Sequence, residues 1–293
     1  MLDLDPTRTG PPPRDASTLV VVRDRTNGGG IEVFCVERRK GGFLGGAVVF
    51  PGGKLEEADL DPGWTALVTP PCPWGTSQAS DEASLRGLAI AACREALEEA
   101  AILPVDGPSP AHAQLLEWRR RLACKEATLR AMLEADGLRL DLAALRPLAR
   151  WITPVSEQRR FDTRFFLFVA DGSLIGVHDD DETTSSFWAA PAEVLRRFAS
   201  RELQLAPPTH RTLEVLVAAR SAMHAAAIAE AACLEPICPR LFSYRDAQGE
   251  TVALALPGDP EHDVREQRSP GSSRYVLRGD RFMPEEASYL PSR

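Results

Sequence analysis

The segment at residues 85–100 constrains this chain most, because it combines an apolar helical face with three glutamates. On a wheel of about 100° per residue, Glu95, Glu98 and Glu99 fall on one side. The opposite side carries small and apolar residues: Leu85, Ala89, Cys93, Ala96, Leu97 and Ala100. Carboxylates spaced three and four residues apart repel and weaken a helix. A segment of this kind standing alone is most often a solvated charged face, whereas a bound divalent cation would remove the repulsion.

A second feature favours the cation. An apolar stretch at residues 47–50 predicts a short strand, and it stops at Pro51, Gly52 and Gly53. Glycine lets the backbone turn tightly and approach a ligand closely. Arg94 directly precedes the first glutamate, where it can pair with a carboxylate and orient it. The two segments together predict a metal site.

Gly53, Asp59 and residues 94–102 together resemble the box of the Nudix hydrolase family, G-x5-E-x7-R-E-U-x-E-E-x-G-U, in which U is a bulky aliphatic residue. Asp59 stands where the family has Glu, and Ala96 and Ala101 stand where it has an aliphatic residue and Gly. Residues 60–93 also separate Asp59 from Arg94, where the family has seven residues. A surface insertion of this size costs little loop entropy.

The resemblance implies both fold and chemistry. Glu95, Glu98 and Glu99 are the implied ligands of Mg²⁺ or Mn²⁺, and Arg94 and Glu98 are implied to act in catalysis. Gly52 and Gly53 are implied to lie against the substrate, and one of their carbonyl groups is a candidate metal ligand. The implied reaction is the hydrolysis of a phosphoanhydride bond.

The interrupted box also narrows the resemblance, because it is similar to that of Nudix coenzyme A diphosphatases with an insertion in the same place. Further similar patches lie at residues 43–53, 151–154, 159–166, 205–208 and 256–259. Such enzymes split coenzyme A into adenosine 3′,5′-bisphosphate and 4′-phosphopantetheine. Their additional arginine motif is incomplete here: Arg38 and Arg39 are present, but Gly42 occupies the place of the second arginine. ADP-ribose, NADH, dinucleoside polyphosphates and capped RNA therefore stay open as substrates, as does a non-catalytic nucleotide-sensing module.

Other site residues are predicted less directly. Arg38 and Arg39 suit a basic patch for substrate phosphates, although a solvated strand end explains them equally well. Glu182, with Asp181 in reserve, is the candidate general base from the acidic segment 178–188, which is otherwise a surface loop. Arg160 and Phe161 are candidates for phosphate and adenine contact, with core packing the alternative for Phe161.

Strand-like runs and helical patterns occur without the regular alternation that signals a doubly wound parallel sheet, which predicts a mixed α+β fold. The resemblance specifies an α/β/α sandwich with a mixed central sheet flanked by helices. We expect a flexible arm at 1–16 and a Nudix domain at 17–205, with an irregular insertion at about 58–82. A C-terminal extension at 206–293 then contains one long helix, about 210–232, and a strand-like tail. That helix could pack on the core or on a second subunit in a homodimer.

Composition limits the partners. The formal net charge of −8 disfavours nucleic acid and anionic membranes, so an anionic small-molecule nucleotide must meet local cations. No apolar run approaches the roughly 18 residues that span a bilayer. The six cysteines match no paired zinc pattern and no secretion signal is evident, so we expect reduced thiols and a cytoplasmic location.

Overall fold

A mixed sheet forms the centre of the computed structural model, which describes residues 5–26, 28–41, 45–70 and 81–286. The path β5-β6-β1-β2-β3-β8 runs across this sheet, with β4 also paired to β1 and β7 also paired to β2. β1 and β6 are parallel over nine residue pairs, whereas β1 and β2 form an antiparallel hairpin. The strands are β1 Arg14–Asp24, β2 Ile31–Arg38, β3 Ala47–Val49, β4 Gly52–Lys54, β5 Arg146–Ile152, β6 Phe161–Val169, β7 Thr183–Ala189 and β8 Gln204–Leu205.

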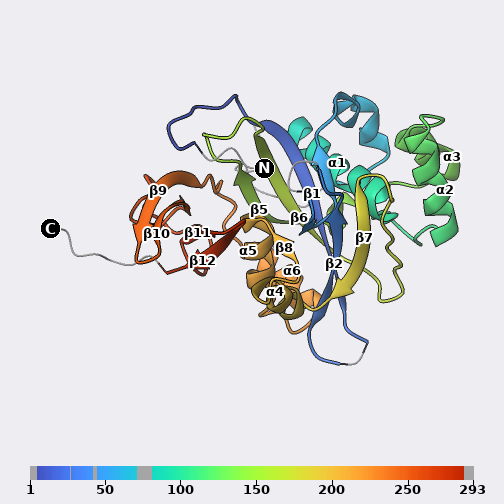
Figure 1. Cartoon of the computed structure of the whole chain (residues 1–293). Coiled ribbons are helices and arrows are strands. Elements are labelled where there is room, and N and C mark those ends of the chain that lie inside the picture. Colours follow the sequence, from blue (N-terminus) through green and yellow to red (C-terminus); the bar gives the residue numbers. More distant parts are fainter. Residues whose placement is uncertain (1–4, 27, 42–44, 71–80, 287–293) are drawn as a thin grey trace.

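Helices cover both faces of this sheet (Figure 1). On one face α1 Glu82–Ala100 packs against β1 and β4, with α2 His112–Ala123 and α3 Leu129–Asp136 beyond it. On the other face lie α4 Pro191–Ala199, α5 Pro207–Leu216 and α6 Ala222–Glu230. Alternate residues of β1 supply the two cores, Leu19 and Val21 on the α1 side and Val20 and Val22 on the other. The predicted α+β class is confirmed.

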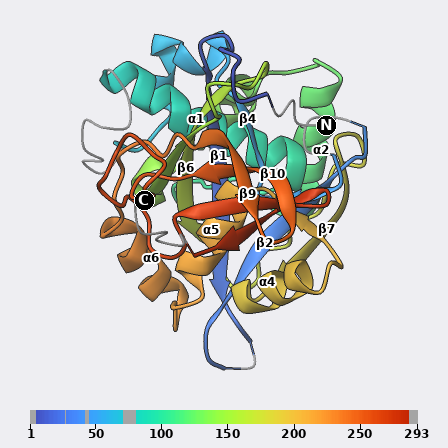
Figure 2. The ribbon, with the colours of Figure 1, turned by 60° about the vertical axis from the view of Figure 1, so that its left-hand side comes forward.

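A second sheet follows α6 and has the antiparallel order β12-β11-β10-β9. Its strands are β9 Arg240–Asp246, β10 Gly249–Ala255, β11 Arg274–Arg278 and β12 Arg281–Glu285. Figure 2, turned from the view of Figure 1, shows these strands in front of the central sheet, with α5 behind them. Leu241, Leu254, Tyr275 and Phe282 belong to the same buried cluster as Val20 and Val22, so the second sheet shares a core with the central one.

Three local predictions differ from the structure. β1 begins at Arg14, inside the predicted arm, because residues 14–16 pair with β6. Gly52–Lys54 is a strand paired with β1 rather than only a turn. The single helix expected at about 210–232 is two helices, because the Ser221 hydroxyl caps a new helix by accepting from His224 N, and Asp24 Oδ1 accepts from Ala222 N.

Other predictions fall partly outside the described residues. The insertion begins with two short 3₁₀ helices, Glu57–Leu60 and Pro62–Ala66, and α1 starts at Glu82 with Asp81 as its cap. Residues 71–80 of the insertion, with Cys72, and residues 42–44 of the arginine-motif segment lie outside the described residues. Among the helices that are described, none combines the length and apolar character needed to cross a bilayer.

Candidate active site

The two halves of the interrupted box meet through Asp59 and Arg94. Arg94 Nε and Nη2 donate to the two carboxylate oxygens of Asp59, each over 3.0 Å, and the Asp59 side chain is buried. Asp59 Oδ2 also accepts from Glu56 N at 2.9 Å, which fixes the carboxylate at the start of the first 3₁₀ helix. Arg94 Nη2 further donates to Lys54 O at 2.9 Å. The insertion therefore leaves β4, Asp59 and α1 joined around one guanidinium group.

The same guanidinium group holds two of the glutamates. Arg94 Nη1 lies 2.8 Å from Glu95 Oε1 and 3.3 Å from Glu98 Oε2. Burial and the hydrogen bonds to Asp59 act in opposite directions, and the pKa of Arg94 is raised on balance, so this residue stays cationic. Arg94 thus orients carboxylates from both halves of the box, as the sequence predicts.

Gly52 and Gly53 allow β4 to lie against the glutamates. Gly52 N donates to Glu99 Oε2 at 3.0 Å. A Cβ atom on Gly53 would come within 2.3 Å of the Glu95 carboxyl carbon, and one on Gly52 would come within 2.5 Å of Ser17 O. Backbone atoms therefore leave no room for a side chain at Gly52, whereas a side chain at Gly53 would displace the Glu95 carboxylate. The backbone of neither glycine is in the left-handed region, so close contact is the reason for both.

The three glutamates carry more negative charge than their neighbours offset. Burial raises the pKa of Glu95 to about 7 and that of Glu99 to about 8, and it also raises the pKa of Glu98. Besides Arg94, Arg38 also lies near them, with Nη1 3.9 Å from Glu99 Oε1. Buried carboxylate oxygens with raised pKa values suit a hard divalent cation, which favours their charged forms. The described residues contain no group of three acidic, His or Cys side chains already converged as a metal site.

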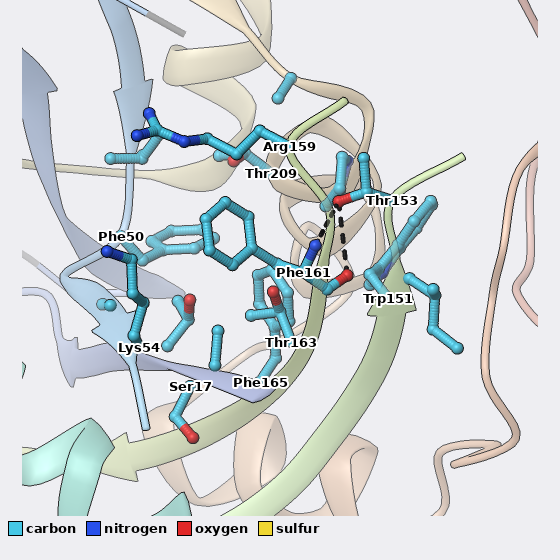
Figure 3. A pocket seen from close by; sticks show the side chains of 18 of the residues that line it. Ser17, Phe50, Lys54, Trp151, Thr153, Arg159, Phe161, Thr163, Phe165 and Thr209 are labelled. Carbon is cyan, nitrogen blue, oxygen red and sulfur yellow. Dashed lines mark hydrogen bonds between the residues drawn. The ribbon is translucent and has the colours of Figure 1, made fainter. Parts of the chain in front are cut away.

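A cavity of about 570 Å³ opens beside these carboxylates. Arg94, Glu95 and Glu98 line it, together with Gly52 and Gly53, while Glu99 lies behind them against Gly52 N. In Figure 3 the rings of Phe50 and Phe161 lie near one another in the middle of the cavity, and the charged ends of Arg159 and Lys54 extend to the same side of these rings. The cavity therefore offers aromatic surface next to cationic and carboxylate groups.

Glu182 and Arg38 also line the cavity. Arg38 Nη2 lies 3.6 Å from Glu182 Oε2, so Arg38 stands between Glu182 and Glu99. Glu182 sits directly before β7, which pairs with β2, rather than within a free loop. Asp179 Oδ2 accepts from Glu182 N at 3.2 Å and holds the turn before the strand.

Two arginines lie elsewhere than the sequence predicts. Arg39 is outside the cavity and binds the backbone near Glu182: its N donates to Glu182 O at 2.8 Å, its Nε to Asp181 O at 2.7 Å and its Nη2 to Asp180 O. Arg160 is also outside, donating to Thr153 O at 3.2 Å and Pro11 O at 2.9 Å, while its neighbour Arg159 lines the cavity. The reserve base Asp181 is not among the lining residues.

Several residues that line the cavity were not predicted from the sequence. Lys54 follows the two glycines directly, so its position next to the box was a usable signal. Leu254 and Phe282 come from the second sheet, and no local pattern connects them to residues so distant in the chain.

Comparison with known proteins agrees with this geometry. Residues 76–216 match the family described as the NUDT19 Nudix domain. The acyl-coenzyme A diphosphatase NUDT19 of Gallus gallus is 32% identical over 219 residues, which cover 60% of this chain and 58% of that protein. Its Xenopus laevis counterpart is 28% identical over 217 residues, covering 60% of this chain and 57% of that protein. The chain thus spans a little more than half the length of these relatives.

A solved structure matches this chain over a larger share of its own length than these relatives do. The crystal structure of a NUDIX hydrolase from Alicyclobacillus acidocaldarius is 34% identical in sequence and superposes with a TM-score of 0.60. The match covers 74% of this chain and 96% of that one. Nudix hydrolases generally use divalent metal ions, in keeping with the glutamates described above. The protein therefore belongs to the Nudix hydrolase family, as shown by this match over 96% of a homologous chain together with the joined box and the mixed sheet between helices.

Proposed function

We propose that the chain is a metal-dependent diphosphatase that cleaves coenzyme A or acyl-coenzyme A. The products are adenosine 3′,5′-bisphosphate and 4′-phosphopantetheine, or its acyl derivative. Water adds across the P–O–P bridge, so that one phosphorus gains the water oxygen and the other keeps the bridging oxygen. The relatives named acyl-coenzyme A diphosphatase support this choice among Nudix substrates.

The observation that carries the proposal is the bidentate contact between Asp59 and Arg94. It rebuilds the box across the insertion and directs the remaining donor of Arg94 to Glu95 and Glu98. A chain that only bound nucleotides would gain nothing from holding repelling carboxylates together at the edge of a cavity.

The proposed cofactor is Mg²⁺ or Mn²⁺, held by Glu95, Glu98 and Glu99. Their hard oxygen donors and raised pKa values suit such an ion. When bound, the ion would neutralise phosphate charge and lower the pKa of a coordinated water.

Side chains of the protein itself would bind the substrate and act as general base. Arg38, Lys54 and Arg159 line the cavity as cations for the diphosphate and the 3′-phosphate. The rings of Phe50 and Phe161 offer flat apolar surface for the adenine. Glu182 is the proposed general base, because it lines the same cavity as Glu95 and Glu98 and its carboxylate lies 3.6 Å from Arg38.

Incubation with Mg²⁺ or Mn²⁺ and a panel of substrates tests the proposal, with products identified by mass. The panel contains coenzyme A, octanoyl-coenzyme A, ADP-ribose, NADH, diadenosine polyphosphates and capped RNA. The expected products are the 4′-phosphopantetheines. Faster cleavage of another member with no 4′-phosphopantetheine would reject the substrate and keep the reaction class. Tight binding without turnover of any member would instead support the nucleotide-sensing alternative.

Location and assembly are separate proposals. The described cysteines are free thiols, which supports a reducing compartment such as the cytoplasm. A homodimer stays a proposal that size-exclusion chromatography with light scattering would test.

A further inference from the structure

The cavity has one wall that the box and the central sheet do not build. Seven of its lining residues come from beyond β8: Ala206, Pro207, Pro208, Thr209, Pro239, Leu254 and Phe282. Leu254 lies on β10 and Phe282 on β12 of the second sheet, and both are nearly fully buried, with 6% and 4% of their surface exposed. The second sheet therefore forms part of the candidate active site.

This wall is fixed to the rest of the molecule. Ile237, just before the second sheet, extends the edge of β5: Ile152 N donates to Ile237 O at 2.9 Å, and Ile237 N donates to Arg150 O at 2.8 Å. Farther along, His210 Nδ1 on α5 lies 3.0 Å from the hydroxyl oxygen of Tyr275 on β11, and both side chains are buried. Backbone pairing at one end and a buried polar contact at the other keep Leu254 and Phe282 in place.

The chemistry of the wall is almost entirely apolar. Thr209 is the only one of the seven residues with a polar side chain, and the three prolines lack even a backbone N–H group. Adenine carries ring nitrogens and an amino group, and burying these without hydrogen-bond partners is unfavourable. A hydrocarbon chain has no such groups, and its burial on the same surface is favourable. The adenine therefore suits the region of Phe161 and Arg159, and the apolar wall suits a chain of methylene groups.

We propose that the second sheet is the specificity element for the acyl chain, with Leu254 and Phe282 as its contact residues. This inference rests on the proposed coenzyme A diphosphatase function and deepens it. It assigns the preference for acylated over free coenzyme A to residues far from the box in sequence. The second sheet is thus part of substrate selection as well as of the core.

The chain offers a matched control for this assignment. Leu254 and Leu241 are register partners on β10 and β9, with 6% and 7% of their surface exposed, and both belong to the core shared with the central sheet. Leu254 lines the cavity and Leu241 does not. Leu254→Ala and Leu241→Ala therefore remove the same atoms from similar burial, and they differ in contact with the cavity.

The experiment measures kcat/KM for octanoyl-coenzyme A and for coenzyme A in the full-length wild type and both variants, with thermal melting as the check on folding. Removing side-chain methyl groups from an apolar pocket changes discrimination by about tenfold. We expect the octanoyl-to-free ratio to fall about tenfold in Leu254→Ala and to match the wild type in Leu241→Ala. Phe282→Leu, a smaller change to the core, is expected to lower the ratio in the same direction.

The outcomes separate the two proposals. Equal ratios in wild type, Leu254→Ala and Phe282→Leu, with coenzyme A still cleaved, would overturn the acyl assignment alone. A fall of the same size in Leu241→Ala would also overturn it, because general loosening of the core would then be the cause. Failure of the wild type to cleave the diphosphate of either octanoyl-coenzyme A or coenzyme A would overturn the proposed function and this inference with it.

Discussion

Arg94 and Asp59 form a buried, two-point ion pair across the insertion, with both hydrogen bonds at 3.0 Å. The side chains are 10% and 2% exposed, and the same arginine also contacts Glu95 and Glu98. One guanidinium group therefore couples the stability of the insertion to the arrangement of the Glu95 and Glu98 carboxylates.

Asp59→Ala is predicted to destabilise the protein strongly and to abolish turnover. Removing one partner of a buried pair leaves an unpaired charge and costs about 3–5 kcal/mol. Urea denaturation measures this loss. Asp61→Ala is the control, because Asp61 pairs with Arg130 at 2.8 Å with its side chain 48% exposed, and caps the second 3₁₀ helix by accepting from Gly63 N. That change should cost about 1–2 kcal/mol. Similar losses for the two variants would show that the Asp59 contact is not special.

Gly53→Ala is predicted to reduce activity more than stability. Its Cβ would lie 2.3 Å from the Glu95 carboxyl carbon and would push that carboxylate away. Displacement of a catalytic group by about 1 Å costs on the order of 100-fold in rate. Steady-state kinetics and a melting curve together test this. Gly172→Ala is the control, since a Cβ there meets nothing within 4 Å. Wild-type kcat in Gly53→Ala would refute the close contact.

The metal-free protein is predicted to lose stability as pH rises. Burial raises the pKa of Glu95 to about 7 and of Glu99 to about 8, from an ordinary value of 4.5. The folded state therefore binds these protons more tightly than the unfolded chain, and stability falls as pH rises from 4.5 through 7 to 8, by about 1.4 kcal/mol per unit of pKa difference for each group.

Melting temperatures in EDTA between about pH 5 and pH 8.5 test this linkage. Glu99→Gln should flatten the curve, because the amide does not titrate. Added Mg²⁺ should restore stability most at the alkaline end, where the carboxylates are charged. Melting temperatures of the metal-free wild type that rise with pH over this range would contradict the prediction.

Arg39 is predicted to be a positioning residue for Glu182. It holds the backbone at residues 180–182 and does not line the cavity. Arg39→Ala should therefore lower kcat and alter its pH profile with little change in KM. Arg38→Ala should instead raise KM, because Arg38 lines the cavity. An increase in KM alone for Arg39→Ala would place Arg39 against the substrate after all.

Local sequence patterns predicted the elements that depend on neighbouring residues. The α1 helix was predicted in this way, as was the meeting of Arg94 with the glutamates that follow it. The break between α5 and α6 depends on Asp24, which lies in a distant hairpin and accepts from Ala222 N. No helical periodicity within residues 210–232 reports that contact.

In the candidate active site, too, residues within the motif were predicted and residues placed by distant contacts were not. Gly53, Glu95 and Glu98 were predicted because the family motif encodes their proximity, even across an insertion. Arg39 and Arg160 were assigned to the substrate by charge, but backbone carbonyl acceptors hold their side chains elsewhere. Leu254 and Phe282 reach the cavity through strand pairing far along the chain, which composition and spacing do not reveal.

Metal-dependent catalysis by the glutamates is tested by measuring turnover against Mg²⁺ concentration in wild type, Glu98→Gln and Glu99→Gln, with coenzyme A as substrate. Each variant keeps the size of the side chain and removes one charge from the carboxylate cluster. We predict no turnover in EDTA for the wild type, and a loss of about 100-fold or more in each variant with a higher Mg²⁺ requirement. Turnover in EDTA equal to that in Mg²⁺, or wild-type rates in Glu98→Gln and Glu99→Gln, would contradict it.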